Sequence, residues 1–208
     1  MSAKNYISSF CKVRSGNIEL NGITVFSEQH TQALDFMKAA YKSHQLNYPK
    51  FYKMDDLCKL AMVASELVLK NNPVTERYTA SDIAIVIANN ASSLEIDTEH
   101  QTTISDKNNY FPSPSVFVYT LPNILIGEIA IKNKIKGENT FFIFDKFDSR
   151  FMSSYVNSLL NTGKASCCIT GWVDLYENKY DAFIYTVEKQ PGKLNIEHTE
   201  EQLTKLYN

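Results

Sequence analysis

Apolar side chains recur every three or four residues along several stretches of the chain, a spacing that places them on one face of a helix. The clearest case begins near Asp55, a residue type that caps helices, and ends at Asn71, Asn72 and Pro73. Its apolar positions are Leu57, Leu60, Ala61, Ala64, Leu67 and Val68. The same spacing predicts further helices over about residues 28–43, 124–135, 148–163 and 199–208.

Two of these predicted helices have recognisable ends. For the 124–135 helix we expect Thr120 as the cap and Pro122 in the first turn, where a missing N–H costs little. The same helix carries Glu128 and Lys132 at i and i+4, which predicts an exposed ion pair. Gly163 is expected to end the 148–163 helix.

Other stretches have the patterns of strands. Residues 81–90 are almost continuously apolar, which indicates a strand covered on both faces. Residues 17–26 carry an Asn-Gly pair between apolar alternations and predict a hairpin. We expect a central strand at 139–145, a strand at 165–171, and a strand pair at 172–189 with its turn at Glu177–Lys179. The order of elements predicts one α/β domain over residues 1–208, layered with a mixed sheet between helices.

Residues 91–112 differ from the rest because they are polar and show little periodicity. They read as a long excursion over the surface. Loops of this length in a compact domain usually have a function, so we expect binding or contact with a partner here.

Composition and charge exclude several classes of function. The 208 residues are 44% hydrophobic, and the net charge of −2 comes without a run of Lys or Arg, which argues against binding to nucleic acid or a membrane surface. No apolar stretch reaches the roughly 18 residues of a membrane span, and the start MSAKNYISSF lacks the pattern of a signal peptide. We therefore expect a cytoplasmic protein.

The four cysteines are Cys11, Cys58, Cys167 and Cys168, and they form no CxxC pair and have no His at metal-ligand spacing. We expect no metal site, no cofactor, and reduced thiols that are mostly buried. Cys167 and Cys168 are neighbours in a predicted strand, so they should point to opposite faces of the sheet.

Three segments together resemble the N-terminal part of β-ketoacyl-[acyl carrier protein] synthases: "YPKFYKMDDLCKLAMVASELVL", "SPSVFVYTLPNILIGEIAIKNKIKGEN" and "GKASCCITGW". The matching positions are Lys53, Met54 and Asp55 in the first segment, Asn123, Gly127, Ile131 and Gly137 in the second, and Gly163, Ala165 and Gly171 in the third. A narrower resemblance is to the short ketosynthase-like proteins of aryl polyene and flexirubin-type pathways in Bacteroidetes.

The resemblance implies a thiolase-like fold, which in ketosynthases consists of two similar α/β halves and dimerises through the N-terminal half. This chain would then be the N-terminal half only. A half-fold leaves apolar surface exposed where the second half would pack, so we expect the chain to form oligomers.

The family's nucleophilic cysteine lies nine residues beyond the glycine matched by Gly137, and that position is Lys146 here. Its neighbours Asp145 and Phe147 offer no thiol either. The family's two histidines belong to the second half, and His30, His44, His100 and His198 match neither of them. Condensation by this chain alone is therefore not expected.

Two replacement nucleophiles remain open. Lys146 would need to be a neutral amine, whereas the simpler hypothesis has Asp145 or Asp148 capping a helix while Lys146 pairs with a carboxylate or reaches solvent. Cys167 or Cys168 would lie inside a strand with no helix dipole and no base, so a structural role is favoured for both.

The leading hypothesis is a non-catalytic, chain-length-factor-like subunit of fatty acid or polyketide-type biosynthesis. It would form a homodimer or a heterodimer with a full-length ketosynthase, and acyl carrier protein is a further candidate partner. The alternatives are a small acyltransferase or thioester-handling enzyme that uses Lys146 or Cys167, and an acyl- or carrier-protein-binding module. Trp172 stands where the family often carries glycine, so it either packs or closes a substrate passage. The residues expected in an acyl pocket or interface are Thr120, Asn123, Phe142, Phe144, Asp145, Lys146 and Trp172. Residues 141–146 are the stretch expected to form the interface.

Overall fold

A mixed sheet of eight strands organises the computed structural model, which describes residues 4–29, 32–108 and 110–208. Seven strands follow the order β3-β2-β1-β7-β6-β4-β5, and the short β8 pairs with β1. Strands β4, β5 and β6 are parallel, whereas β7 runs antiparallel between β6 and β1. The strands are β1 (Tyr6–Arg14), β2 (Asn17–Leu20), β3 (Ile23–Ser27), β4 (Ile83–Asn89), β5 (Asn139–Ile143), β6 (Cys167–Tyr176), β7 (Lys179–Glu188) and β8 (Ile196–Glu197).

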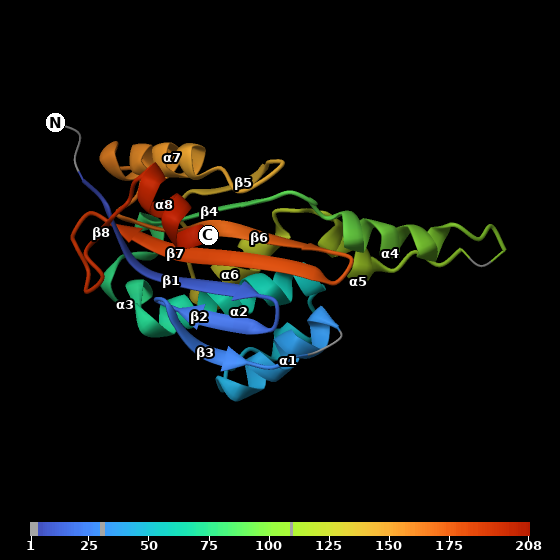
Figure 1. Ribbon diagram of the computed structural model, residues 1–208. Helices are drawn as coiled ribbons and strands as arrows, with labels where there is room; N and C mark the ends of the chain where they lie inside the picture. The colour runs from blue at the N-terminus through green and yellow to red at the C-terminus, as the bar shows by residue number, and fades with distance from the viewer. Residues whose placement is uncertain (1–3, 30–31, 109) are drawn as a thin grey trace.

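Helices cover both faces of this sheet (Figure 1). On one face α1, α2 and α6 enclose the larger apolar core, and on the other α7 and α8 enclose a second one. The α-helices are α1 (Ala33–Ser43), α2 (Asp56–Asn71), α3 (Val74–Arg77), α4 (Leu94–Ile104), α5 (Pro114–Phe117), α6 (Ile124–Asn133), α7 (Ser149–Asn161) and α8 (Glu200–Tyr207). Short 3-10 turns are η1 (Pro49–Lys53), η2 (Ala80–Asp82) and η3 (Val118–Thr120).

Most of the predicted elements are confirmed. Asp55 caps α2 by accepting a hydrogen bond from the backbone N–H of Cys58, and every residue of β4 is buried. The Asn-Gly turn joins β2 to β3, the turn at 177–178 joins β6 to β7, and the C-terminal helix forms. Cys167 and Cys168 point into the two different cores, as the alternation along a strand requires.

Four expectations about elements were wrong. Helix α1 begins at Ala33 rather than near residue 28, and the "irregular" excursion contains the eleven-residue α4. Helix α6 is preceded at its N-cap by Asn123, because Thr120 already belongs to η3. Strand β5 is an edge strand paired with β4 alone, not a central one.

The predicted surface pair between Glu128 and Lys132 does not form. Glu128 is 2% exposed and pairs with Lys50 at 2.6 Å, while Lys132 pairs with Glu66 at 3.3 Å. The α6 face that carries Glu128 packs inward, and partners distant in sequence take the place of the i,i+4 neighbour.

Gly137 has a steric reason for being glycine. A Cβ at this position would lie 2.3 Å from the carbonyl oxygen of Ile83, closer than side-chain carbons approach. The chain leaving α6 therefore runs directly against the start of β4, and this contact sets the entry into β5.

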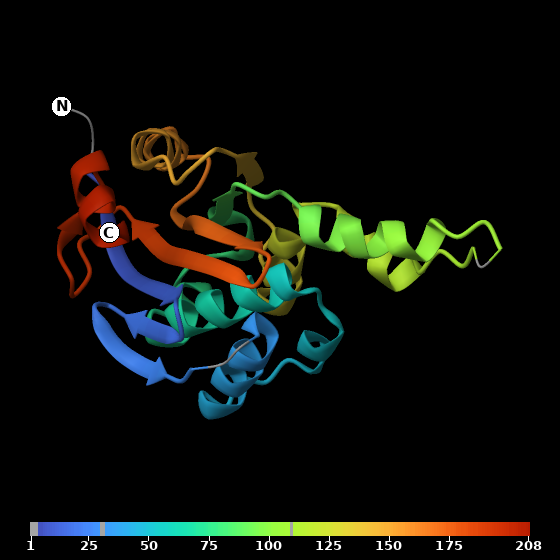
Figure 2. The same cartoon turned by 45° about the vertical axis from the view of Figure 1, so that its right-hand side comes forward.

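Residues 91–123 are called the arm, and its described residues, 91–108 and 110–123, leave the end of β4 and project away from the sheet in two views (Figure 1, Figure 2). Six large apolar side chains on the arm are exposed: Leu94, Tyr110, Phe111, Phe117, Val118 and Leu121. The outer residues of α7 and α8 are polar instead, among them Ser154, Ser158, Glu201 and Lys205. Among the described residues, the arm therefore carries large exposed apolar side chains, whereas α7 and α8 carry none.

Among the described residues, no single helix is long and apolar enough to cross a bilayer. The segments Pro114–Thr120 and Ile124–Asn133 meet that test only as a pair, with a bend of 100° between them.

Candidate functional site

The carboxyl ends of the parallel strands β4, β5 and β6 meet at one edge of the sheet, the usual position of binding sites in α/β folds. The chain leaving β5 passes through residues 144–148 and enters α7 there. Asn90 fixes this turn, since its side-chain amide donates to the carbonyl oxygens of Phe144 and Asp145 at 3.3 and 3.0 Å. Lys146 therefore lies in the turn that precedes α7.

A cleft of about 660 Å³ opens at this turn. One wall is formed by residues 144–150, and the other by Glu200, Thr204, Tyr207 and Asn208 at the C-terminal helix. The Ser149 and Thr204 hydroxyls lie 2.7 Å apart and link α7 to α8 across it. The cleft is thus built from two helices of the same layer and one sheet end.

The groups in this cleft do not form a nucleophilic centre. The Asp148 carboxylate accepts the Phe151 N–H at 2.8 Å, so the N-terminus of α7 is already capped. The Lys146 side chain is exposed, and within the described residues no carboxylate lies in ion-pair distance of it. Of the two alternatives for Lys146, the structure fits the one in which it reaches solvent.

The cysteines are no better placed. All four are free and buried, and burial raises the pKa of the Cys167 and Cys168 thiols well above the usual value. A thiol that stays protonated inside a strand is a poor nucleophile. The described part of the chain thus offers no activated thiol for an acyl-transfer reaction.

Tyr207 closes the back of the cleft and was not identified from sequence. Its ring centre lies 4.5 Å from that of Phe147, and the Arg14 guanidinium lies 4.1 Å from the Tyr207 ring centre. The Tyr207 hydroxyl donates to Asp181 at 2.5 Å, and Arg14 also pairs with Asp181. Only the apolar spacing of Leu203, Leu206 and Tyr207 in the tail hinted that this helix packs on the body.

The residues expected in a pocket or interface separate into three groups. Phe144, Asp145 and Lys146 line the cleft. Phe142 stacks on Phe144 at 5.7 Å within a half-buried aromatic cluster beside β5 that also contains Phe151 and Tyr155. Their roles remain predictions.

The other three expected residues lie away from the cleft. Trp172 is 4% exposed and packs edge-on against Phe147 at 6.3 Å, so it fills the core behind the cleft. Thr120 and Asn123 lie at the base of the arm, where the Thr120 carbonyl accepts a hydrogen bond from Ser93 at 2.9 Å. The structure does not bring these two residues to Lys146.

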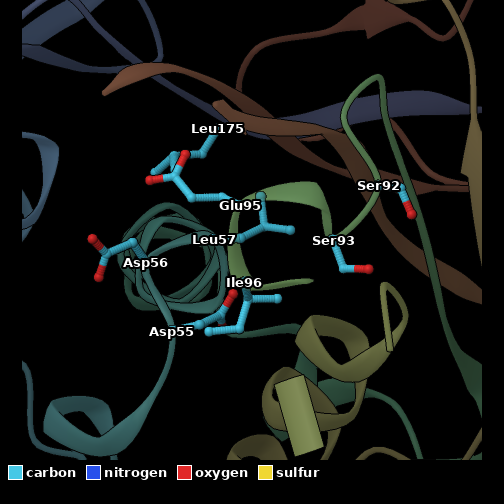
Figure 3. Close-up of a pocket in the computed structure, with 8 residues that line it drawn as sticks. All are labelled: Asp55, Asp56, Leu57, Ser92, Ser93, Glu95, Ile96 and Leu175. Atoms are coloured by element: carbon cyan, nitrogen blue, oxygen red, sulfur yellow. The ribbon is translucent and has the colours of Figure 1, made fainter. Parts of the chain in front are cut away.

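A second, much smaller pocket of about 50 Å³ lies between the start of α2 and the base of the arm (Figure 3). Asp55, Asp56 and Glu95 border it, but their carboxylates point in different directions. Burial raises the pKa of Asp55 to about 6, against the opposing effect of its hydrogen bond from Cys58. Lys59 pairs with Asp56 at 2.9 Å, so the negative charge of this carboxylate already has a positively charged partner.

No group of three metal-ligating side chains occurs in the described part of the chain. His44, His100 and His198 lie at the end of α1, within α4 and before α8, and therefore do not converge. His30 lies outside the described residues.

The chain matches no known family model and no curated protein by sequence. Its structure is similar to solved ones at low identity. The ishigamide ketosynthase/chain length factor matches with a TM-score of 0.67 and 15% identity over 89% of this chain and 62% of that one. A ketosynthase complex with a type II PKS acyl-carrier protein, AntDE:AntF, matches with a TM-score of 0.62 and 12% identity over 90% of this chain and 63% of that one.

A third structure contains the ketosynthase ApeO with its chain length factor ApeC from Xenorhabdus doucetiae. It matches with a TM-score of 0.56 and 12% identity over 90% of this chain and 79% of that one. The chain thus spans less than two thirds of the length of the first two structures. Strand order, two-sided helical cover and these matches agree, and the chain has the thiolase-like α/β fold found in ketosynthases and chain length factors.

Proposed function

We propose that this chain is a non-catalytic subunit that pairs with an active ketosynthase, in the manner of a chain length factor. One observation carries the proposal: in a ketosynthase-like fold, an exposed lysine stands at the turn before α7 where the resemblance expects the nucleophilic cysteine. The four buried thiols offer no substitute. A ketosynthase-like fold without a cysteine at the expected position favours a role in assembly.

The pairing surface proposed is the free edge of β5. Within the described residues β5 hydrogen-bonds to β4 alone, so its outer backbone groups are available to another strand. Ile143 on this strand is 54% exposed and would be covered in a complex. A strand from a subunit related by a two-fold axis would extend the sheet here.

Three finer parts of the proposal rest on the sequence resemblance. They are that the chain corresponds to the N-terminal half of a ketosynthase, that it contacts acyl carrier protein, and that it belongs to an aryl polyene pathway of fatty acid or polyketide type. Similar structures include a ketosynthase bound to a chain length factor and one bound to a carrier protein, which supports pairing with a ketosynthase and contact with acyl carrier protein.

Acyl loading followed by intact-mass spectrometry tests the proposal. The chain is co-expressed with the full-length ketosynthase encoded nearest to it, and the purified proteins are incubated with acyl-loaded carrier protein. We expect a stable complex in which only the ketosynthase acquires the acyl group. The control is the ketosynthase with its cysteine changed to alanine, which should bind this chain but acquire no acyl group.

Two results would favour the alternatives instead. Acylation of this chain that disappears in Lys146→Ala or Cys167→Ser would establish a thioester-handling enzyme. Binding to carrier protein without any affinity for the ketosynthase would establish a carrier-binding module.

A further inference from the structure

The arm has a charge that differs from the rest of the molecule. Residues 91–123 contain Glu95, Asp97, Glu99 and Asp106 but one basic residue, Lys107, so the arm carries a net charge of −3. Because the whole chain carries −2, everything outside the arm carries +1. Glu99 and Asp106 are exposed and form no ion pair within the described residues.

Exposed apolar side chains accompany these charges. Phe111 is 77% exposed, Tyr110 59%, Phe117 57% and Leu121 54%, all within residues 110–121. Single exposed apolar residues are ordinary, but several aromatic ones close together in sequence mark an interaction surface. The arm therefore combines exposed apolar side chains with negatively charged side chains that form no ion pair within the described residues.

The base of the arm is held firmly to the body. The Ser93 hydroxyl bridges Asp97 at 3.0 Å and the Thr120 carbonyl at 2.9 Å, joining the outgoing and returning segments. Glu95 accepts the backbone N–H of Glu177 at 2.9 Å, and Tyr119 is buried beside Glu128. An element fixed at its base loses little conformational freedom when its outer part binds.

We propose that the arm is the element that selects the partner, by inserting residues 110–121 into an apolar groove with a basic rim on the ketosynthase subunit. This inference rests on the proposed function and adds the chemistry of the recognised surface. Anionic membranes and nucleic acids carry the wrong charge to receive this arm. A second copy of the chain is a poor match as well, because its surface outside the arm has little excess positive charge.

The charge also gives the arm a role in choosing between assemblies. Pairing through the β5 edge alone depends on backbone groups, which any edge strand can supply. The acidic arm adds attraction to a basic groove and repulsion from an acidic one, so it favours the heterodimer over the homodimer.

Titration calorimetry with the same full-length ketosynthase tests this inference on the intact chain. Phe111→Ser together with Phe117→Ser should weaken binding about a hundredfold, the size typical of central interface residues. Glu99→Gln with Asp106→Asn should weaken binding several-fold at low salt and reduce its dependence on NaCl concentration. Thermal unfolding should be unchanged in both variants, because the substituted side chains are exposed.

Matched controls separate these effects from general surface changes. Ile131→Ser removes an apolar side chain that is 64% exposed on α6, and Glu76→Gln with Glu201→Gln removes two exposed charges away from the arm and from β5. Both controls should bind like the unmodified chain.

The possible failures are distinguishable. If the unmodified chain does not bind the ketosynthase, the proposed function is wrong and this inference falls with it. If it binds and the arm variants bind equally well, the proposed function stands and the arm inference is wrong. Arm-dependent self-association in sedimentation, or arm-dependent binding to phosphatidylglycerol vesicles, would likewise overturn the choice of partner.

Discussion

His198 is a buried histidine whose protonation should oppose folding. It is 2% exposed, its Nδ1 donates to the Asn157 side-chain oxygen at 2.9 Å, and its ring lies 5.7 Å from that of Tyr185. Burial lowers the pKa of His198 to about 3. An unfolded histidine has a pKa of about 6.5, so the unfolded state binds the proton more readily. The stability contributed by neutral His198 is therefore complete above pH 6.5 and is lost as the pH falls below it.

Asp55 has the opposite effect over part of this range. Its pKa is raised to about 6, so the folded state holds this proton more tightly than the unfolded state. Its contribution makes the protein more stable as the pH falls from about 6 toward 4. The two effects overlap, and the pH profile of the unmodified chain alone cannot separate them.

The difference between two profiles isolates the histidine. The free energy of unfolding is measured in urea between pH 7.5 and 5 for the unmodified chain and for His198→Gln. The difference between the two free energies should change by up to about 1.4 kcal/mol per pH unit below pH 6.5. Relative to its own value at pH 7.5, the variant should retain more stability in acid. Parallel profiles would show that His198 is not a buried neutral group.

Helix α8 stabilises the second core as an element. Leu203 is fully buried among side chains from α7, β6 and β7, and Leu206 and Tyr207 pack beside it. We expect Leu203→Ala to lower the free energy of unfolding by about 2–5 kcal/mol, because it removes buried methyl groups and leaves a cavity. Lys205→Ala on the exposed side of the same helix is the control and should change stability by less than about 0.5 kcal/mol. Equal stability of the two variants in urea would mean that α8 does not hold the sheet face.

Elements defined by local patterns were predictable, whereas those defined by distant partners were not. The α2 cap at Asp55 and the continuous burial of β4 follow from neighbouring residues alone. The edge position of β5 was missed, because an aromatic strand looks the same whether one or both of its edges are paired. Strand β1 was not anticipated at all, although it pairs with β7, β2 and β8.

The candidate site was predictable in the same partial way. The motif spacing led to the turn before α7, and Asp148 caps that helix as one of the two expected carboxylates. The opposite wall of the cleft comes from α8, about sixty residues later in the chain, and no local pattern links Tyr207 to Arg14 and Asp181. Thr120 and Asn123 were grouped with Lys146 by motif, but the fold places them at the base of the arm.

At the scale of the whole molecule, the fold and the arm are energetically separable. The two cores lie on the two faces of the sheet, and the arm contributes buried Ile96 and Tyr119 and half-buried Val116 to the larger one. Beyond that base, α4 contacts α5 and η3, with the rings of His100 and Phe117 at 5.5 Å. Deleting residues 101–116 and joining 100 to 117 by about four Gly and Ser residues therefore spans a short gap, and it removes one half-buried side chain, Val116, from the edge of the larger core.

The shortened chain should unfold cooperatively with a midpoint within a few degrees of the unmodified protein, because it loses almost no buried apolar area. The same chain should lose its binding to the ketosynthase. A control in which residues 101–116 are kept but their order is scrambled should fold equally well and also fail to bind, since it keeps the charge and length but not the placement of the aromatic residues. A large drop in the unfolding midpoint of the shortened chain would instead make the arm part of the folding unit. Full binding by the scrambled chain would mean that the placement of Tyr110 and Phe111 does not select the partner, which would contradict the proposed role of the outer arm.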